Sequence, residues 1–245
     1  MWHKPQLLNA LADLLFAAAA AALVVACAVW AVRMPSLPIR QVVVTQELKE
    51  VRRGEVELAL AGMLRGNFFS VNLEAIRASL ESLPWVRKAE VRRQWPAQLQ
   101  VTIEEHKPVA RWDDGRNAGR NELVNSYGEL FIAWLPEKAA SELPILHGPQ
   151  GTAPEVLKRY AGFVGTLQPV GLKPTQLTLS PRLAWQMKFA DGMVMNLGRE
   201  QNKAPLESRL ARFVEVYPVM LGKSPAPPAV VDLRYPNGFA VRIRG

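Results

Sequence analysis

Hydrophobic positions follow three different patterns along the chain, and each predicts a different kind of structure. Residues 14–32 form one uninterrupted apolar run with no charge and no proline. A helix that rises about 1.5 Å per residue would cover about 28 Å over that run, close to the hydrocarbon thickness of a bilayer. The pattern therefore predicts a single membrane-spanning helix at 14–32 after a short leading segment, residues 1–13.

The same run is open to two other interpretations, a cleaved signal peptide and a lipoprotein signal. Ala26-Cys27-Ala28 has the small-x-small form of a cleavage site, and the residues before Cys27 loosely resemble a lipobox. However, an export signal has an apolar core of about 7 to 15 residues, whereas this run continues to Val32. Trp30 beside Arg33 also has the character of an interfacial anchor. We favour the uncleaved anchor, with the lipoprotein second.

A second pattern, over residues 39–107, mixes helical and alternating spacing. Two prolines make 33–38 a stiff linker. Asn72 is a helix cap, and Pro96-Ala97 turns the chain between two runs of alternating apolar and polar residues. The expected elements are a strand at 39–46, helices at 55–64 and 73–83, and a hairpin of strands at 85–95 and 99–103. The order β-α-α-β-β predicts an α+β unit with both helices on one face of a small sheet.

The third pattern, over residues 108–245, consists of short β-rich runs interrupted by two helices. Asp191-Gly192 is a tight-turn signal between two of the runs. Strands are expected at 109–112, 122–125, 129–132, 175–179, 185–189, 193–197, 230–234 and 239–243, and helices at 154–167 and 205–218. This spacing predicts a mostly antiparallel β domain with helices packed on one face, so that the whole chain is of the α+β class.

Composition excludes several classes of function. The net charge of +8 comes from 30 basic and 22 acidic residues that are interspersed, which indicates a solvated mixed surface rather than a nucleic-acid site. Cys27 is the single cysteine, so no intramolecular disulfide can form. The three histidines lack the spacing of metal ligands, and we expect no metal and no cofactor.

Catalytic patterns are missing from the sequence as well. Glu104 and Glu105 are adjacent on a predicted strand, so their side chains point to opposite faces and cannot act as an acid-base pair. No Gly-x-Ser-x-Gly and no Ser-x-x-Lys occurs. We expect no catalytic residues, no enzyme activity and no small-molecule substrate.

Several segments resemble the FtsQ/DivIB family of bacterial cell division proteins. The first unit contains Phe68-Phe69-Ser70-Val71-Asn72-Leu73 and the segments 83–96 and 101–112, which resemble the POTRA domain of that family. Residues 197–199, 210–218 and 231–238 resemble its second, β-rich domain in the same order. Together with the apolar run, the resemblance covers essentially the whole chain.

The resemblance implies a POTRA domain at 39–107 and an FtsQ-type β-rich domain at 108–245. It implies a single-pass protein of the cell inner membrane, enriched at the division septum, with residues 1–13 cytoplasmic and both domains periplasmic. The charges that flank the span leave this orientation open. The implied function is a non-catalytic divisome scaffold that binds FtsB, FtsL and other divisome proteins and links early to late division proteins and septal peptidoglycan synthesis. The alternative is a POTRA-containing envelope assembly or secretion component, whose barrel would need many more strands.

The candidate binding surface lies at the end of the chain. A last strand, 239–243, would be a sheet edge to which a partner strand can add. By family analogy, FtsB would contact Arg234, Tyr235, Asn237, Gly238, Phe239 and Val241. Tyr235 would be a buried anchor and Arg234 a carboxylate partner. Arg182, expected on a neighbouring strand, would add a salt bridge.

Each of these assignments has a structural alternative. Residues 235–238 could be only a hairpin turn, because Asn-Gly favours turn geometry, and Arg182 could be only a solvated charge. Trp85 and Trp95 are interpreted as core and hairpin packing of the first domain, with partner contact as the minor alternative.

Overall fold

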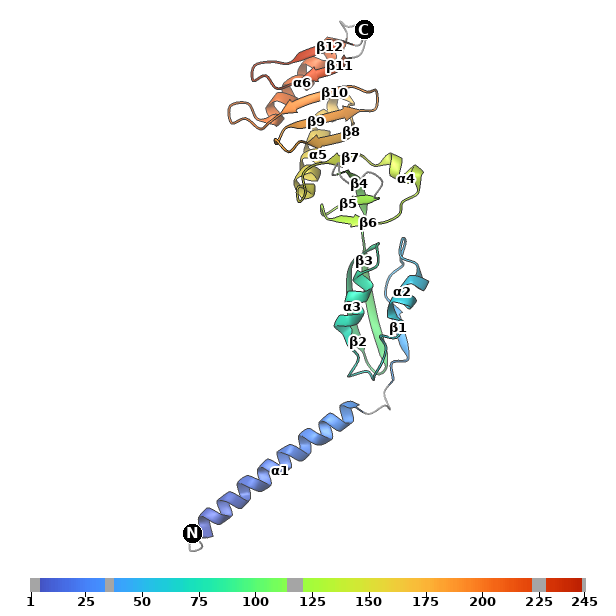
Figure 1. Cartoon of the computed structure of the whole chain (residues 1–245), viewed down its shortest axis with the longest axis vertical. Helices are drawn as coiled ribbons and strands as arrows, with labels where there is room; N and C mark the ends of the chain where they lie inside the picture. The colour runs from blue at the N-terminus through green and yellow to red at the C-terminus, as the bar shows by residue number, and fades with distance from the viewer. Residues whose placement is uncertain (1–4, 34–37, 114–120, 222–227, 244–245) are drawn as a thin grey trace. The chain divides into compact units, whose positions relative to one another are not determined.

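The computed structural model describes residues 5–33, 38–113, 121–221 and 228–243 (Figure 1). Helix α1, Pro5–Arg33, contains the whole predicted apolar run and begins before it. Within α1, residues 9–30 are long and apolar enough to cross a membrane, and their side chains are exposed. The predicted helix is therefore confirmed as one continuous helix that passes through Cys27, and by length and composition it is a candidate membrane span.

The chain divides into two compact units, Met1–Glu105 and His106–Gly245. After α1, the first unit contains β1 (Gln41–Val44), α2 (Arg53–Leu60), α3 (Leu73–Glu81), β2 (Val86–Gln94) and β3 (Gln98–Glu105). The predicted β-α-α-β-β order is confirmed. Helix α2 ends earlier than expected because Ala61 leaves the helical region and Gly62 has a φ of 78°. Asn72 caps α3 as predicted, since its Oδ1 accepts the Ala75 N–H at 3.0 Å.

The sheet of the first unit has the order β1-β3-β2, with β1 parallel and β2 antiparallel to β3. Both helices supply the core on one side of it. The fully buried side chains include Ile76 and Leu80 of α3 and Leu99, Val101 and Ile103 of β3. The apolar face that the spacing of α3 predicts and the apolar face that the alternation of β3 predicts thus pack in the same core.

The two tryptophans of the first unit differ in their surroundings. Trp85 packs against the core, as predicted. Trp95 at the β2–β3 turn lies edge-on to Phe68, with ring centroids 5.9 Å apart, yet it remains 68% exposed. Trp95 therefore packs on Phe68, as predicted, but most of its side chain is exposed to solvent.

The second unit is built on one nine-stranded sheet. Its elements are β4 (Pro108–Asp113), β5 (Glu122–Asn125), β6 (Leu130–Ile132), α4 (Glu137–Glu142), β7 (Ile145–His147), α5 (Ala153–Leu167), the 3-10 helix η1 (Gln168–Val170), β8 (Pro174–Leu179), β9 (Trp185–Phe189), β10 (Val194–Gly198), α6 (Leu206–Leu221), β11 (Pro228–Asp232) and β12 (Ala240–Ile243). The strand order is β12-β11-β10-β9-β8-β7-β4-β5-β6.

Strand β7 and helix α4 were not predicted, and helix α6 continues past Pro218, near which it was expected to end. Strand β7 pairs in parallel with both β4 and β8, and β10 pairs in parallel with β11. The other described strand pairs of this sheet are antiparallel, so the mostly antiparallel prediction and the α+β class are confirmed.

Helices α5 and α6 cover one face of the nine-stranded sheet (Figure 1). Phe163 of α5 and Phe213 of α6 are buried in the same core as Leu177, Met187 and Val231 of the strands. Residues next to these on the strands face the other side, as period-two alternation requires. The uncovered face carries a row of paired polar residues, Thr178, Gln186, Asn196 and Asp232, one from each of four neighbouring strands.

Candidate partner-binding site

Strand β12 ends the nine-stranded sheet. Among the described strands it pairs only with β11, in the register Asp232 to Ala240 and Val231 to Val241. Its position at a sheet edge was predicted from the sequence and is confirmed. A strand in this position directs half of its backbone N–H and C=O groups away from the sheet, where an added strand could pair with them.

The connection before β12 is longer than predicted. The sequence suggested a turn at residues 235–238, whereas residues 233–239 all lie outside the strands. Neither Asn237 nor Gly238 is among the residues with positive φ that the structure describes, so the Asn-Gly hairpin geometry is not adopted. Leu233 still bonds to the sheet, because its N–H donates to the carbonyl of Asn196 on β10, at 2.8 Å. Phe239 likewise precedes the strand that was expected to contain it.

Helix α6 and the segment before it hold the loop 233–239 in place. Arg209, only 2% exposed, donates to the carbonyl of Leu233 at 2.9 Å. Arg212, one turn later, donates to the carbonyl of Pro236 at 2.7 Å. The side chain of Gln201 donates to the carbonyl of Arg234 at 3.3 Å. We call these three side chains, Gln201, Arg209 and Arg212, the loop clamp.

Arg209 also ties other turns of this region together. It donates to the carbonyls of Leu197, Arg199 and Ala204, in addition to that of Leu233. Burial lowers the pKa of its guanidinium, and the charges of Glu200 and Glu207 partly offset that shift. The group stays protonated, since an arginine keeps its proton in a protein. One buried cation therefore organises the ends of β10 and β11 and the start of α6.

Arg234 is exposed and is held by Asp232. Its Nε lies 2.9 Å and 3.0 Å from the two carboxylate oxygens, and its Nη2 lies 2.6 Å from Oδ2. The hydrogen bonds from Arg234 lower the pKa of Asp232, and the same contact raises the pKa of Arg234. Gly198 makes room for this arrangement, because a Cβ there would lie 2.8 Å from Arg234 Cγ. Arg234 therefore already has one carboxylate partner within the chain, Asp232.

The remaining predicted residues of this segment differ in what they present. Tyr235 is 54% exposed and Asn237 is exposed, so both side chains are accessible. Phe239 is half-buried, with its ring edge-on to Phe213 at a centroid distance of 5.6 Å. Val241 is half-buried and pairs with the buried Val231, so it faces the helix side. The structure thus divides the predicted set into exposed residues and half-buried residues.

Arg182 does not lie on a strand, contrary to the prediction. It is an exposed residue of the turn between β8 and β9. The reason is local: Leu183 has a φ of 59° and donates its N–H to the carbonyl of Ser180, which closes the chain into a turn. This turn nevertheless lies at the same end of the sheet as Arg234. A concavity of ≈ 260 Å³ is lined there by Thr178, Ser180, Ala184, Trp185, Gln186, Asn196, Gly198 and Arg234.

The loop clamp was missed at the level of sequence, although one signal was present. Arg209 falls within the apolar stripe of α6 between Leu206 and Leu210, on the face that becomes buried. A charged residue at such a position needs several fixed acceptors, and unpaired carbonyls at the ends of strands and turns supply them. The stripe was interpreted only as core.

Each of the two units matches a known protein family model. Residues 37–106 match the family model described as POTRA domain, FtsQ-type. Residues 110–234 match the model described as Cell division protein FtsQ/DivIB, C-terminal, which covers half of the chain.

Relatives named Cell division protein FtsQ match along the full length. The chain is 39% identical to the protein of Burkholderia pseudomallei over 245 residues, which is 100% of this chain and 95% of the relative. It is 37% identical to the protein of Nitrosospira multiformis, with 99% of each chain covered. It is 34% identical to that of Bordetella pertussis, with 99% and 93% covered. The polypeptide therefore belongs to the FtsQ/DivIB family of cell division proteins.

Proposed function

We propose that this cell division protein is a non-catalytic scaffold of the inner membrane that receives a strand of FtsB on β12. In this proposal, FtsB and FtsL associate with the second unit on the periplasmic side. The scaffold then links early division proteins to late ones and to septal peptidoglycan synthesis. The observation that carries the proposal is the position of β12 at the sheet edge. Most of the loop before β12 is exposed, and the loop clamp fixes its backbone by hydrogen bonds.

Strand addition suits the geometry of β12. The added strand would exchange backbone hydrogen bonds with the outward groups of residues 240–243. Each such bond contributes about 0.5–1.5 kcal/mol net, and β12 is only four residues long. The backbone alone therefore cannot give a tight complex, and side chains beside the strand have to contribute.

Tyr235 and Arg234 are the side chains best placed for this. Tyr235 has an exposed aromatic ring on a backbone that is fixed on both sides, by Arg209 at Leu233 and by Arg212 at Pro236. Burying such a ring in an interface costs little conformational entropy, which is typical of residues that dominate binding energy. Arg234 would share its guanidinium between Asp232 and an acidic residue of the partner.

Two matched substitutions test the anchor. Tyr235→Ala should abolish co-purification of FtsB and FtsL with the full-length protein from detergent-solubilised membranes. Tyr127→Ala is the control, because Tyr127 is a similarly exposed tyrosine in the turn between β5 and β6, at the other edge of the sheet. Undiminished binding by the Tyr235 variant would refute the assignment.

Proline substitutions in β12 test strand addition itself. Neighbouring residues of an edge strand direct their N–H groups alternately into the sheet and outward. Of Val241→Pro and Arg242→Pro, one variant therefore removes an N–H from the β11 ladder and the other removes an outward N–H. The outward variant should lose FtsB while keeping the melting temperature of the parent protein. If that variant binds FtsB normally, the partner does not add as a strand.

A further inference from the structure

One end of the first unit collects exposed apolar side chains from two separate segments, the α2–α3 loop and the β2–β3 turn. Because β1 is parallel and β2 antiparallel to β3, the start of β1, the β2–β3 turn and the α2–α3 loop share one end of the sheet. The Arg40 N–H donates to the carbonyl of Ala97 at 2.8 Å. The guanidinium of Arg93 donates to the carbonyls of Phe68 and Phe69, at 2.7 Å and 3.1 Å. We call this surface, residues 38–41, 61–72 and 95–98, the entry end.

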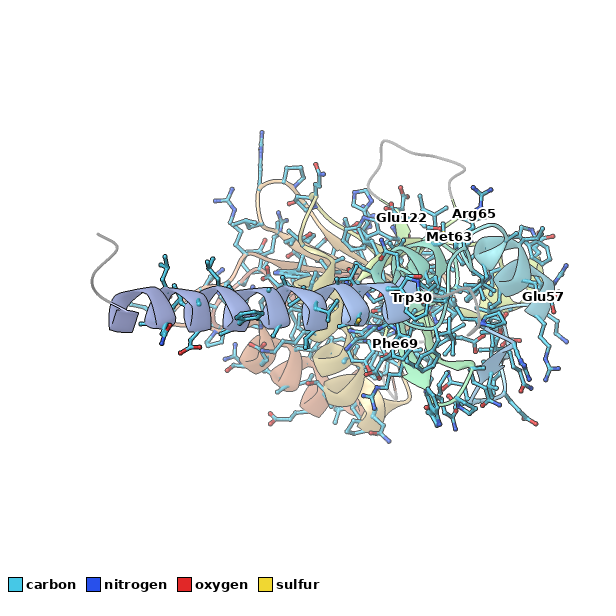
Figure 2. All side chains as sticks on the ribbon, turned by 90° about the horizontal axis from the view of Figure 1, so that it is seen from below. Trp30, Glu57, Met63, Arg65, Phe69 and Glu122 are labelled. Atoms are coloured by element: carbon cyan, nitrogen blue, oxygen red, sulfur yellow. The ribbon has the colours of Figure 1, made fainter. Side chains whose placement is uncertain are left out.

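The entry end is apolar and basic at once. Trp95 is 68% exposed, Phe69 44%, and Met63 and Leu64 37% each. Figure 2 labels Met63 and Phe69 together with Arg65, which is exposed in the same loop as Met63. Scattered single apolar residues on a surface need no explanation, but four from two segments at one end form a patch.

The covalent chain fixes how far this patch can be from the bilayer. The apolar window of α1 ends at Trp30, and the helix itself ends at Arg33, less than one turn later. Arg40 is already bonded into the entry end. Seven Cα-to-Cα steps separate Arg33 from Arg40, and they span at most about 25 Å when fully extended. The entry end is therefore confined to the vicinity of the membrane surface on the side where α1 emerges.

We propose that the entry end docks on the bilayer itself. Trp95, Phe69, Met63 and Leu64 enter the interface between headgroups and acyl chains, where tryptophan is enriched in membrane proteins. Arg65 is held at the phosphate level, where the headgroups of anionic lipids attract it. The tether raises the effective concentration of the surface, so that a weak intrinsic affinity is sufficient.

Docking at this end would also determine how far the other end of the first unit lies from the membrane. Strand β3 begins at Gln98 in the entry end and runs to Glu105, where the first unit stops. Eight residues of strand extend about 26 Å. If the entry end lies on the membrane, the last residue of the first unit, Glu105, would therefore lie well outside the headgroup layer.

The test measures immersion depth on the full-length protein in nanodiscs with one copy per disc. The lipid is three parts phosphatidylethanolamine to one part phosphatidylglycerol, and Cys27→Ala removes the native thiol. A spin label is placed by Gln94→Cys next to the entry end. A second label, by Glu50→Cys, marks the opposite end, because the Glu50 N–H donates to the Glu105 carboxylate. Collision with a water-soluble nickel chelate is then compared with collision with oxygen.

The label at position 94 should be several-fold less accessible to the chelate than the label at position 50, and more accessible to oxygen. The double variant Trp95→Ala with Phe69→Ala should remove that difference. Trp134→Ala should preserve it, since Trp134 is 70% exposed but belongs to the second unit. Equal chelate accessibility at both positions in the parent protein would overturn the proposal, and so would protection that survives the double variant. An unchanged spectrum of the label at position 50 shows that the variants keep their fold.

Discussion

Replacing Arg209 by methionine should destabilise the second unit by about 3–5 kcal/mol, because one buried guanidinium satisfies several carbonyls. Arg209 donates to the carbonyls of Leu197, Ala204 and Leu233, and all three residues are at most 5% exposed. A fourth bond reaches the carbonyl of Arg199. Methionine fills a similar volume but provides no donor.

The magnitude follows from three buried acceptors that lose their donor. Leaving one of them unpaired costs about 1–3 kcal/mol, so the gross loss is about 3–9 kcal/mol. Two effects oppose it: the variant no longer has to desolvate a charge, and it buries additional apolar surface. The lower part of the range, about 3–5 kcal/mol, is therefore the expected net loss.

Native-state hydrogen exchange read by mass spectrometry separates the two units of this chain. Peptides from β9, β10 and β11 should exchange faster in Arg209→Met by the factor that corresponds to the loss, whereas peptides from β2 and β3 should be unchanged. Arg212→Met is the matched control. It removes one hydrogen bond, to the carbonyl of Pro236, and should cost at most about 1 kcal/mol. Equal effects of the two substitutions, or a loss below about 1 kcal/mol for Arg209→Met, would refute the reasoning.

Three further predictions concern the same region and the orientation of the chain. Gly198→Ala should cost about 1–2 kcal/mol in urea unfolding, because Gly198 has a φ of 75° and a Cβ would meet Arg234; adding Arg234→Ala should recover part of this, and strictly additive losses would contradict the clash. Arg234→Gln should raise the pKa of Asp232 in a carboxyl carbon NMR titration. Arg234 lowers the pKa of Asp232 in the folded state, so the pair stabilises the protein at pH values above the pKa of the unfolded carboxyl. That contribution is lost as the pH falls through the folded pKa. An unchanged titration of Asp232 in the variant would show that the contact does not persist in solution. Protease added to spheroplasts should digest the second unit, and complete protection would contradict a periplasmic location.

The first unit was predictable because its pattern is local and regular. The apolar spacing of α3 and the alternation of β3 each identify a buried face without reference to the rest of the chain. The errors occurred where one or two residues determine the end of an element. At Ala61 and Gly62, the backbone dihedral angles end α2 before the apolar stripe ends. The exposure of Trp95 was missed for another reason, because the pattern of a hairpin does not reveal which side of a turn residue is covered.

The second unit was predictable in class but not in topology. Strand β7 has only three residues, and its pairing with β4 and β8 is with distant parts of the chain. Three residues are too few to establish a period, and long-range parallel pairs leave no local signature. The Asn-Gly signal also failed, because the chain between β11 and β12 forms a longer loop whose carbonyls at Leu233 and Pro236 accept from Arg209 and Arg212. Tertiary contacts decided these features.

The sheet edges in the described part of the chain are not equally suited to receiving a partner. Strand β2 presents Lys88, Glu90 and Arg92 on its exposed side, and charges in such positions discourage pairing. Strand β6 has only three residues. Strand β12 has four, too few to hold a partner by backbone bonds alone, but it follows a loop that the clamp keeps ordered before any partner arrives. Ordering in advance reduces the entropy lost on binding, so helix α6, which does not need to touch the partner, should set much of the affinity. Arg212→Met, which leaves the fold intact but frees the loop at Pro236, should therefore weaken FtsB binding while every proposed contact residue remains in place.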